Sequence, residues 1–243
     1  MQLKPVGHLK TCYPDKFGVP RQPGLVEAAW GELIFEREWQ PELALEGIEE
    51  FSHLWLIFGF HKNTNQVYRP KVHPPRLKGG SIGVFATRSP HRPNDLGLSL
   101  VKLERREGAR LWVSGPDLVD GTPIYDVKPY LPMVESKPDA RAGWAARADA
   151  VRAEVEWTPE ALVGLEAWMR RRPTAGERLK TLIEESVALD PRPVVYRGFE
   201  GEKDAKYRQL HAIRIEGGDV HFEFPEPKRA RIVKVVPQYT KTE

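Results

Sequence analysis

Two arginines and an asparagine stand close together in a segment whose prolines exclude a helix. The segment Gly83–Ser99 reads GVFATRSPHRPNDLGLS and holds Arg88, Arg92 and Asn94. Proline lacks a backbone donor and disfavours the helical conformation in the residue before it. A guanidinium group held by a stiff loop can bind a carboxylate or a phosphate through paired hydrogen bonds. We therefore interpret this segment as a recognition loop that follows a strand.

Two further segments place polar groups next to rigid or buried backbone. GVPRQPG holds Arg21 and Gln22 between two prolines. From composition alone, a solvated surface turn is the plainer interpretation of this segment. FSHLWLIFGF predicts a buried strand, and His61 and Lys62 follow it at the position where such a strand would reach the rim of a sheet.

A fourth segment, DLVDGTPIYDVKPYLP, spans Asp117–Pro132 and surrounds a Gly-Thr-Pro turn with acidic residues. Asp126 and Lys128 are two residues apart, so on a strand they share one face. An ordinary surface ion pair explains these two residues as well as a functional site does.

The net charge of the chain is only +3, but the charges are unevenly distributed. No Asp or Glu occurs from Phe60 to Asn94. The same stretch holds seven cationic side chains, namely Lys62, Arg69, Lys71, Arg76, Lys78, Arg88 and Arg92. Such a block requires either a nearby anion or good solvation.

Several classes of protein are excluded by what the sequence lacks. One cysteine, Cys12, allows neither an intrachain disulfide nor a Cys-based zinc site, and the histidines do not fall at metal-ligand spacings. The phosphate-binding, dinucleotide-binding, GxSxG and HExxH motifs do not occur. The longest apolar run, Leu54–Phe60, is far shorter than the about 20 residues that cross a bilayer. We expect a cytoplasmic protein without metal or membrane contact.

The elements that must position these groups are mostly strands in the first part of the chain. Their spacing leaves no room for long crossover helices, which favours an antiparallel sheet or barrel. A short helix is predicted at Pro41–Gly47. The predicted strands are Leu3–Lys10, Trp30–Phe35, His53–Phe60, Ile82–Thr87, Leu98–Glu104, Leu111–Ser114 and Thr122–Val127.

The second part of the chain has a different pattern. Residues 136–158 are predicted as a connection. Helices then follow at Pro159–Met169, with Leu162, Leu165, Trp168 and Met169 on the apolar side, and at Glu177–Leu189, with Leu179, Leu182, Ile183 and Ser186 on the apolar side. Tyr207–Ile215 and Val220–Phe224 predict a hairpin, and Ile232–Val236 a last strand. We therefore expect a mainly β domain over 1–140 and a smaller α+β domain over 150–243.

Taken in order, the motifs PRQPG, FSHLW…FH, FATRSPxRPN…G and DLVDGTPxxDxKPYLP resemble those of the TrmO (TsaA-like, YaeB) family of tRNA (adenine-N6)-methyltransferases. The resemblance covers residues 1 to about 135, and DPRP at 190–193 is similar to the family's C-terminal region. It implies a single N-terminal β-barrel of the class VIII methyltransferase type, S-adenosyl-L-methionine as cofactor, and a homodimer. The implied reaction methylates N6 of threonylcarbamoyladenosine (t6A) at position 37 of tRNA, next to the anticodon, giving m6t6A.

The same resemblance, carried over residue by residue, implies which side chains form the site. Cofactor contacts are expected from Pro20, Arg21, Gln22, His61, Lys62, Arg88, Leu98, Asp117, Leu118, Val119 and Asp120. Contacts with the tRNA anticodon stem-loop are expected from Arg92, Asn94, Lys128 and Tyr130. The chain departs from the family pattern at Asp95, where proline is common, and at Lys62, where glutamine is common.

The implied reaction makes modest chemical demands on the protein. A methyl group on a sulfonium is already activated, so the protein mainly has to align it with the attacking nitrogen. That nitrogen is weakly nucleophilic because it carries a carbonyl substituent, and a carboxylate could accept its proton. Asp126 and Asp120 are the candidates, and positioning without a general base is the open alternative.

Two other functions remain open at this point. One is a methyltransferase of the same cofactor class that acts on another substrate. The other is a non-catalytic RNA-binding barrel, which would use the cationic stretch and need no cofactor. For the tRNA-methylating function, we expect the RNA surface to extend from Phe60–Asn94 to cations of the second domain, namely Lys180, Arg192, Arg197, Lys203, Lys206 and Arg208.

Overall fold

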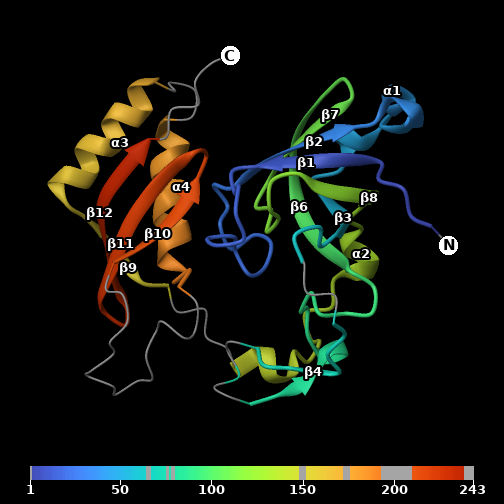
Figure 1. Cartoon of the computed structure of the whole chain (residues 1–243). Helices are drawn as coiled ribbons and strands as arrows, with labels where there is room; N and C mark the ends of the chain where they lie inside the picture. The colour runs from blue at the N-terminus through green and yellow to red at the C-terminus, as the bar shows by residue number, and fades with distance from the viewer. Residues whose placement is uncertain are drawn as a thin grey trace. The chain divides into compact units, whose positions relative to one another are not determined.

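A computed structural model describes residues 2–63, 67–74, 77, 80–147, 152–171, 176–192 and 210–237 of the chain (Figure 1). The fold consists of two compact units whose segments alternate along the sequence. We name them the barrel unit (Met1–Lys10, Gly31–Ser114 and Gly121–Ala150) and the sheet unit (Thr11–Trp30, Gly115–Asp120 and Val151–Glu243). The expected division into 1–140 and 150–243 stays a prediction.

Six strands close into a barrel in the order β1-β2-β7-β6-β3-β8. Side chains alternate between the interior and the outer face, as β1 illustrates, and the leucines at 9, 33, 54, 56 and 111 are completely buried inside. The mainly β barrel expected from the motifs is therefore confirmed. The strands are β1 (Gly7–Thr11), β2 (Trp30–Phe35), β3 (His53–Gly59), β6 (Leu96–Glu107), β7 (Arg110–Ser114) and β8 (Thr122–Pro129).

One predicted strand of this region, Ile82–Thr87, is wrong after its first two residues. Only Ile82–Gly83 (β5) is extended, and it pairs with Lys71–Val72 (β4). A 3-10 turn, η3 (Val84–Ala86), follows in place of the predicted strand. Thr87 ends the turn because both its N–H and its Oγ1 donate to the Val84 carbonyl, at 3.1 and 2.7 Å. A side chain that bonds to nearby backbone competes with strand pairing, and here it prevails.

Short helical segments connect the strands of the barrel unit. The predicted helix at Pro41–Gly47 is the single turn α1 (Pro41–Ala44), preceded by η1 (Arg37–Trp39) and followed by η2 (Ile48–Glu50). After β8 come α2 (Pro132–Glu135) and η4 (Gly143–Arg147), neither of which was expected.

The sheet unit contains a four-stranded sheet in the order β10-β11-β12-β9 and two helices. Its elements are β9 (Glu154–Trp157), α3 (Pro159–Arg171), α4 (Gly176–Ala188), β10 (Leu210–Ile215), β11 (Gly218–Glu226) and β12 (Arg229–Pro237). The predicted helices and hairpin are confirmed, although residues 207–209 of the hairpin lie outside the described residues. The predicted connection over 136–158 is wrong at its end, because β9 lies there and pairs in parallel with β12.

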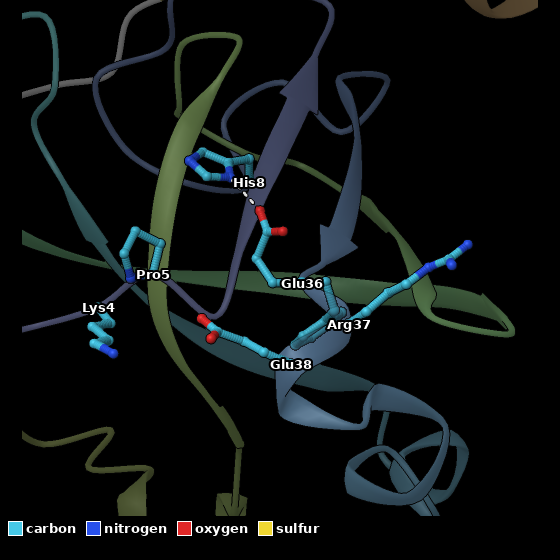
Figure 2. A pocket seen from close by; sticks show the side chains of 7 residues that line it. Lys4, Pro5, His8, Glu36, Arg37 and Glu38 are labelled. Atoms are coloured by element: carbon cyan, nitrogen blue, oxygen red, sulfur yellow. Dashed lines mark hydrogen bonds and ion pairs between the residues drawn. The ribbon is translucent and has the colours of Figure 1, made fainter.

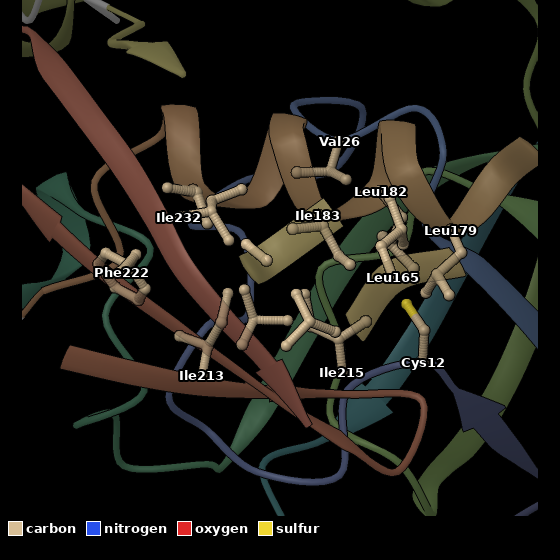
Figure 3. Close-up of a cluster of buried hydrophobic side chains, with 14 of the residues drawn as sticks. Cys12, Val26, Leu165, Leu179, Leu182, Ile183, Ile213, Ile215, Phe222 and Ile232 are labelled. Carbon is tan, nitrogen blue, oxygen red and sulfur yellow. The ribbon is translucent and has the colours of Figure 1, made fainter. Parts of the chain in front are cut away.

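One face of this sheet carries a large apolar core (Figure 3). Ile213, Val220, Phe222 and Ile232 point from the strands toward the helices, and Leu179, Leu182 and Ile183 of α4 meet them as predicted. On α3, Leu165 and Trp168 are buried, but Leu162 is 37% exposed, contrary to the prediction. Ala161 takes its place at the interface.

The segment between β1 and β2 completes this core. Cys12, Tyr13, Val26 and Ala29 are at most 1% exposed and belong to the same apolar cluster (Figure 3). Polar contacts fix the segment: Glu216 N–H donates to the Cys12 carbonyl at 2.9 Å, and Ala28 N–H donates to Oε2 of Glu185 at 3.0 Å. Residues that sequence pattern assigns to the barrel region are thus part of the other unit's interior.

Candidate functional site

The four polar segments predicted from the sequence are distributed over both units, and the Asp117–Pro132 segment is divided between them after Asp120. PRQPG and Asp117–Asp120 lie in the sheet unit, whereas His61–Lys62 and the 87–98 segment lie in the barrel unit. Each pair is described within its own unit.

In the sheet unit, backbone contacts bring the PRQPG loop beside the segment that begins at Gly115. Gly24 N–H donates to the Gly115 carbonyl at 2.8 Å, and Gly115 N–H donates to the Ala29 carbonyl at 2.9 Å. Gly24 and Gly115 both have positive φ, 75° and 72°, which side-chain-bearing residues rarely adopt. A Cβ on Gly115 would also lie 3.2 Å from the Gly24 Cα. Glycine is therefore required where the two loops meet.

The Asp117–Asp120 segment is held by Thr11 at the end of β1. Thr11 N–H donates to Oδ1 of Asp120 at 2.9 Å, and Thr11 Oγ1 donates to the Leu118 carbonyl at 3.0 Å. Asp120 N–H donates in turn to the Tyr13 carbonyl at 2.8 Å. The contacts leave Asp120 half-buried in a fixed position, which suits a carboxylate that has to meet a polar ligand group.

Burial separates the residues of these two loops into two kinds. Pro20 and Leu118 are buried, so their side chains shape the loops from inside. Arg21, Gln22 and Asp117 are half-buried, as is Val119, and each takes part in polar or electrostatic contacts of its own. The half-buried group is the one whose side chains can reach a ligand.

In the barrel unit, the end of β3 is joined to the start of β6. Phe60 N–H donates to the Asp95 carbonyl at 2.9 Å, and Asn63 Nδ2 donates to the Pro90 carbonyl at 3.2 Å. These contacts place His61 and Lys62 beside the recognition loop, as the barrel-rim interpretation predicts. Asp95, which stands where the family often has proline, thus anchors the loop through its carbonyl oxygen.

The recognition loop is braced from within by Arg92. Its Nη1 donates to the Thr87 carbonyl at 2.8 Å and to the Val84 carbonyl at 3.3 Å. Arg92 thereby donates to the loop backbone with the same guanidinium group that we expected to contact tRNA. Arg88 and Asn94 are exposed on the same loop, and Nδ1 of His91 is buried with no hydrogen-bond partner in the described part of the chain.

A second group of predicted residues lies on the outer face of the barrel. Ile57 of β3 pairs with Leu98 of β6 on one side and with Asp126 of β8 on the other, so the three side chains form one row. Leu98 and Asp126 are separated by two strand spacings, about 10 Å. Leu98 is 52% exposed, which is unusual for a large apolar residue on a barrel.

The ion pair that the sequence suggested on β8 is confirmed. Lys128 Nζ lies 3.1 Å from Oδ2 of Asp126, and both side chains are about half exposed to solvent, at 62% and 47%. Tyr130 packs edge-on against Trp55 and His53, with ring centroids 6.0 and 6.4 Å apart. The outer face therefore combines a carboxylate, an ammonium group and apolar surface.

A pocket of about 780 Å³ lies elsewhere on the barrel unit, and none of the predicted site residues lines it (Figure 2). Its walls are Lys4, Pro5, His8, Phe35, Glu36, Arg37 and Glu38. His8 Nδ1 lies 3.3 Å from Oε1 of Glu36 in the pocket wall. Charges of both signs alternate around it, so it lacks the excess of one sign that attracts a charged ligand. No sequence motif marks these residues.

One expectation for the sheet unit's cations needs correction. Arg192 is not a surface cation, because its side chain is 11% exposed, pairs with both oxygens of Asp190 at 2.8 and 3.0 Å, and stacks on Phe224. Lys180 is about half exposed and pairs with Glu184. Arg197, Lys203, Lys206 and Arg208 lie outside the described residues, as do Arg76 and Lys78 of the cationic stretch.

Within the described residues, no group of three His, Cys, Asp or Glu side chains could hold a metal ion. The helices of the described ranges include none long and apolar enough to span a membrane.

Comparison with known proteins extends over nearly the whole chain. The family model described as the tRNA-methyltransferase O N-terminal domain matches residues 8–136, and the TrmO C-terminal domain matches residues 150–238. An Escherichia coli protein named tRNA (adenine(37)-N6)-methyltransferase is 44% identical over 228 residues, which cover 91% of this chain and 95% of that protein. A Pseudomonas aeruginosa protein, named provisionally as the S-adenosylmethionine-dependent methyltransferase RcsF, is 41% identical and 96% of each chain is covered.

Solved structures of TrmO have a similar fold. A crystal structure of TrmO from Pseudomonas aeruginosa is 36% identical and superimposes with a TM-score of 0.78, covering 97% of this chain and 98% of that one. Another crystal structure of TrmO is 37% identical with a TM-score of 0.77, covering 97% of this chain and 99% of that one.

Proposed function

The chain belongs to the TrmO family, and from that premise we propose that it transfers a methyl group from S-adenosylmethionine to N6 of the adenosine at position 37 of tRNA. The single observation that carries this proposal is the 44% identity, over nearly full length, to the Escherichia coli protein of that name. We further propose that the acceptor adenosine is t6A, that the product is m6t6A, and that the reaction takes place in the cytoplasm.

Side chains within each of the two units suit chemical groups of this cofactor. S-adenosylmethionine presents a carboxylate, an ammonium group, ribose hydroxyls and an apolar adenine face, and it supplies an activated methyl group when bound. In the sheet unit, Arg21 and Gln22 offer donors and Asp120 offers an acceptor. In the barrel unit, Arg88 is an exposed donor and Leu98 an exposed apolar surface. The unpartnered Nδ1 of His91 also fits a loop that is completed by a ligand.

We propose that cofactor contacts come from Pro20, Arg21, Gln22, His61, Lys62, Arg88, Leu98 and Asp117–Asp120. The backbone hydrogen bonds from Gly24 to Gly115 and from Phe60 to Asp95 support this set, because each one holds together two of the segments that contain these residues. A fixed arrangement matters here because alignment of the methyl carbon with the attacking nitrogen provides most of the rate.

We propose Asp126 as the group that accepts the proton of N6, with Asp120 as the alternative. Asp126 lies in the same outward row as Leu98, about two strand spacings away, and its carboxylate is accessible to solvent. Val127 N–H donates to its Oδ1 at 2.9 Å, which orients the carboxylate. An ionised carboxylate is an acceptor and can serve as a general base.

For the tRNA we propose contacts with Arg92, Asn94, Lys128 and Tyr130, and with the cations of the acid-free stretch. Arg69, Lys71 and Arg88 of this stretch are exposed to solvent, where cationic side chains can contact phosphates. The anticodon loop is single-stranded, which lets a base leave the stack at little cost. We also propose that the protein acts as a homodimer.

The experiment that tests this function measures methyl transfer by the purified full-length chain. tRNA substrates with and without t6A at position 37 are incubated with methyl-labelled S-adenosylmethionine, and the digested nucleosides are analysed by mass spectrometry. The proposal expects m6t6A only from the t6A-containing tRNA. Methylation of unmodified adenosine would overturn the t6A assignment, and transfer to no tRNA would overturn the activity.

Calorimetry with S-adenosylmethionine distinguishes the proposed methyltransferase from a non-catalytic RNA-binding protein. A non-catalytic RNA-binding barrel would bind tRNA and release no heat with the cofactor. Arg88→Ala is expected to weaken cofactor binding, and Leu43→Ala on α1, which removes a similarly exposed side chain far from the predicted residues in sequence, serves as its control.

A further inference from the structure

Phe85 is a large apolar side chain that the fold leaves in solvent. It belongs to η3, is 70% exposed, and directly follows Val84, which is 1% exposed. Large aromatic side chains usually contribute to stability by leaving water, and Phe85 contributes little in this way. A ring that is held outward by a buried neighbour is therefore available for another contact.

The backbone around Phe85 is rigidly held. Thr87 closes the turn by donating twice to the Val84 carbonyl. Trp144 Nε1 donates to the Ala86 carbonyl at 2.8 Å, which fixes the turn from outside. Because the backbone on both sides of Phe85 is hydrogen-bonded, that backbone loses little conformational freedom when something packs on the ring.

A guanidinium group lies over the ring. The Arg92 Cζ is 5.6 Å from the centroid of Phe85, and the two backbone carbonyls that Nη1 contacts hold it there. This Arg92 is the cation that braces the loop, so ring and cation form one preformed unit. A planar cation beside an aromatic face is the combination on which proteins stack unpaired nucleobases.

The surrounding charge favours a polyanion. Phe85 lies within the acid-free stretch Phe60–Asn94, and Arg88 is exposed three residues away. A second copy of the chain that packed here about a two-fold axis would bring two such cationic stretches together, which costs free energy. A nucleic acid strand would instead place its phosphates against these cations.

We propose that Phe85, oriented by Arg92, is a stacking platform for an unpaired base of the RNA substrate. The inference rests on the proposed function, because it assumes that the protein binds tRNA. It adds to that function a contact that recognises the flat face of a base in the anticodon loop, independent of base identity and separate from the phosphate contacts.

The test compares the affinity of variants for a fluorescently labelled anticodon stem-loop, measured by anisotropy with the full-length protein. Phe85→Ala is expected to weaken binding by about 5- to 100-fold, the range for loss of one base–aromatic stack. Phe85→Trp is expected to bind at least as tightly as the original protein. Phe85→Leu keeps apolar bulk without a π face and is expected to bind nearly as weakly as Phe85→Ala.

Four controls distinguish stacking from other causes. The salt dependence of binding should keep its slope in Phe85→Ala, since no cation is removed. Cofactor affinity and melting temperature should not change, and Leu43→Ala, which removes another exposed side chain, should bind like the original protein. If Phe85→Leu binds as tightly as the original, or if Phe85→Ala converts a dimer to a monomer, the ring packs against protein and the proposal is wrong. If the original protein binds no tRNA, the proposed function fails first.

Discussion

Replacement of Asp120 separates the structural role of its carboxylate, which the Thr11 hydrogen bond shows, from the cofactor contact that we propose for it. Its Oδ1 accepts the N–H of Thr11, a residue that is only 7% exposed, at 2.9 Å. Asp120→Ala leaves that N–H without a partner in a nearly dry position. Asp120→Asn keeps an oxygen acceptor at the same place and removes only the charge.

The expected loss of stability in Asp120→Ala follows from the kind of hydrogen bond that is lost. A hydrogen bond to a charged group contributes about 1.5–3 kcal/mol to the free energy of unfolding. For a chain of this length each kcal/mol corresponds to about 2–4 °C in melting temperature, so Asp120→Ala should melt roughly 3–12 °C lower. Asp120→Asn should melt within about 2 °C of the original, because its amide oxygen accepts the same hydrogen bond.

Cofactor affinity supplies the second readout. If the carboxylate also contacts S-adenosylmethionine, calorimetry should show about 10- to 100-fold weaker binding for Asp120→Asn, despite its preserved stability. A pattern in which Asp120→Asn melts as low as Asp120→Ala would refute the reasoning from the Thr11 hydrogen bond. Unchanged affinity in a stable Asp120→Asn protein would remove Asp120 from the cofactor site.

Further outcomes follow from other contacts. Gly97→Ala should destabilise the barrel by about 1–3 kcal/mol in urea unfolding, because its Cβ would lie 2.2 Å from Cζ of Phe58, whereas Gly83→Ala, which meets nothing within 4 Å, should be neutral. Burial raises the pKa of the Cys12 thiol from 9.0 to about 12, so the folded state keeps a proton that the unfolded state loses. The contribution of the protonated thiol to the free energy of unfolding is complete below pH 9 and falls by about 1.4 kcal/mol per pH unit as the pH rises toward 12. Native Cys12 should also resist alkylation by iodoacetamide at about pH 8, and rapid alkylation would contradict its burial. Arg88→Ala should lower the slope of log Kd against log salt for tRNA by about one, and an unchanged slope would mean that Arg88 meets no phosphate.

The strands of the barrel could be predicted because their signal is local. His53–Gly59 and Trp30–Phe35 alternate or concentrate apolar residues over a length that fits one strand, and the structure has them within one residue of the prediction. β9 could not be predicted in the same way, because its four residues pair with β12, which lies over 70 positions later. Long-range pairing leaves little trace in a short segment.

The buried face of α3 illustrates a second limit of prediction from sequence. Periodicity placed Leu162 on the buried side of α3, but the helix approaches β12 very closely at Gly164, where an added Cβ would lie 2.3 Å from the Val235 carbonyl oxygen. Only small residues fit such an approach, so Ala161 and Gly164 face the sheet and Leu162 turns outward. Spacing predicts that a face exists, but the partner decides which residues occupy it.

The candidate site was predicted as segments and not as an arrangement. Motif order identified the loops that the structure ties together, such as PRQPG with the loop after Gly115. Its placement in the sheet unit was not foreseen, because residues 11–30 have no strand or helix pattern and their partners, such as Glu185 and Glu216, come more than 150 positions later.

The late partners of the segment after β1 have a consequence for biosynthesis. Cys12, Tyr13, Val26 and Ala29 leave the ribosome early, but the strands that cover them extend to Pro237. Translation proceeds at roughly 5–20 residues per second, so these apolar side chains remain uncovered for on the order of 10–40 seconds before the last strands are synthesised. The nascent chain is thus exposed to misassembly during that interval, and slower translation of the final hairpin would lengthen it.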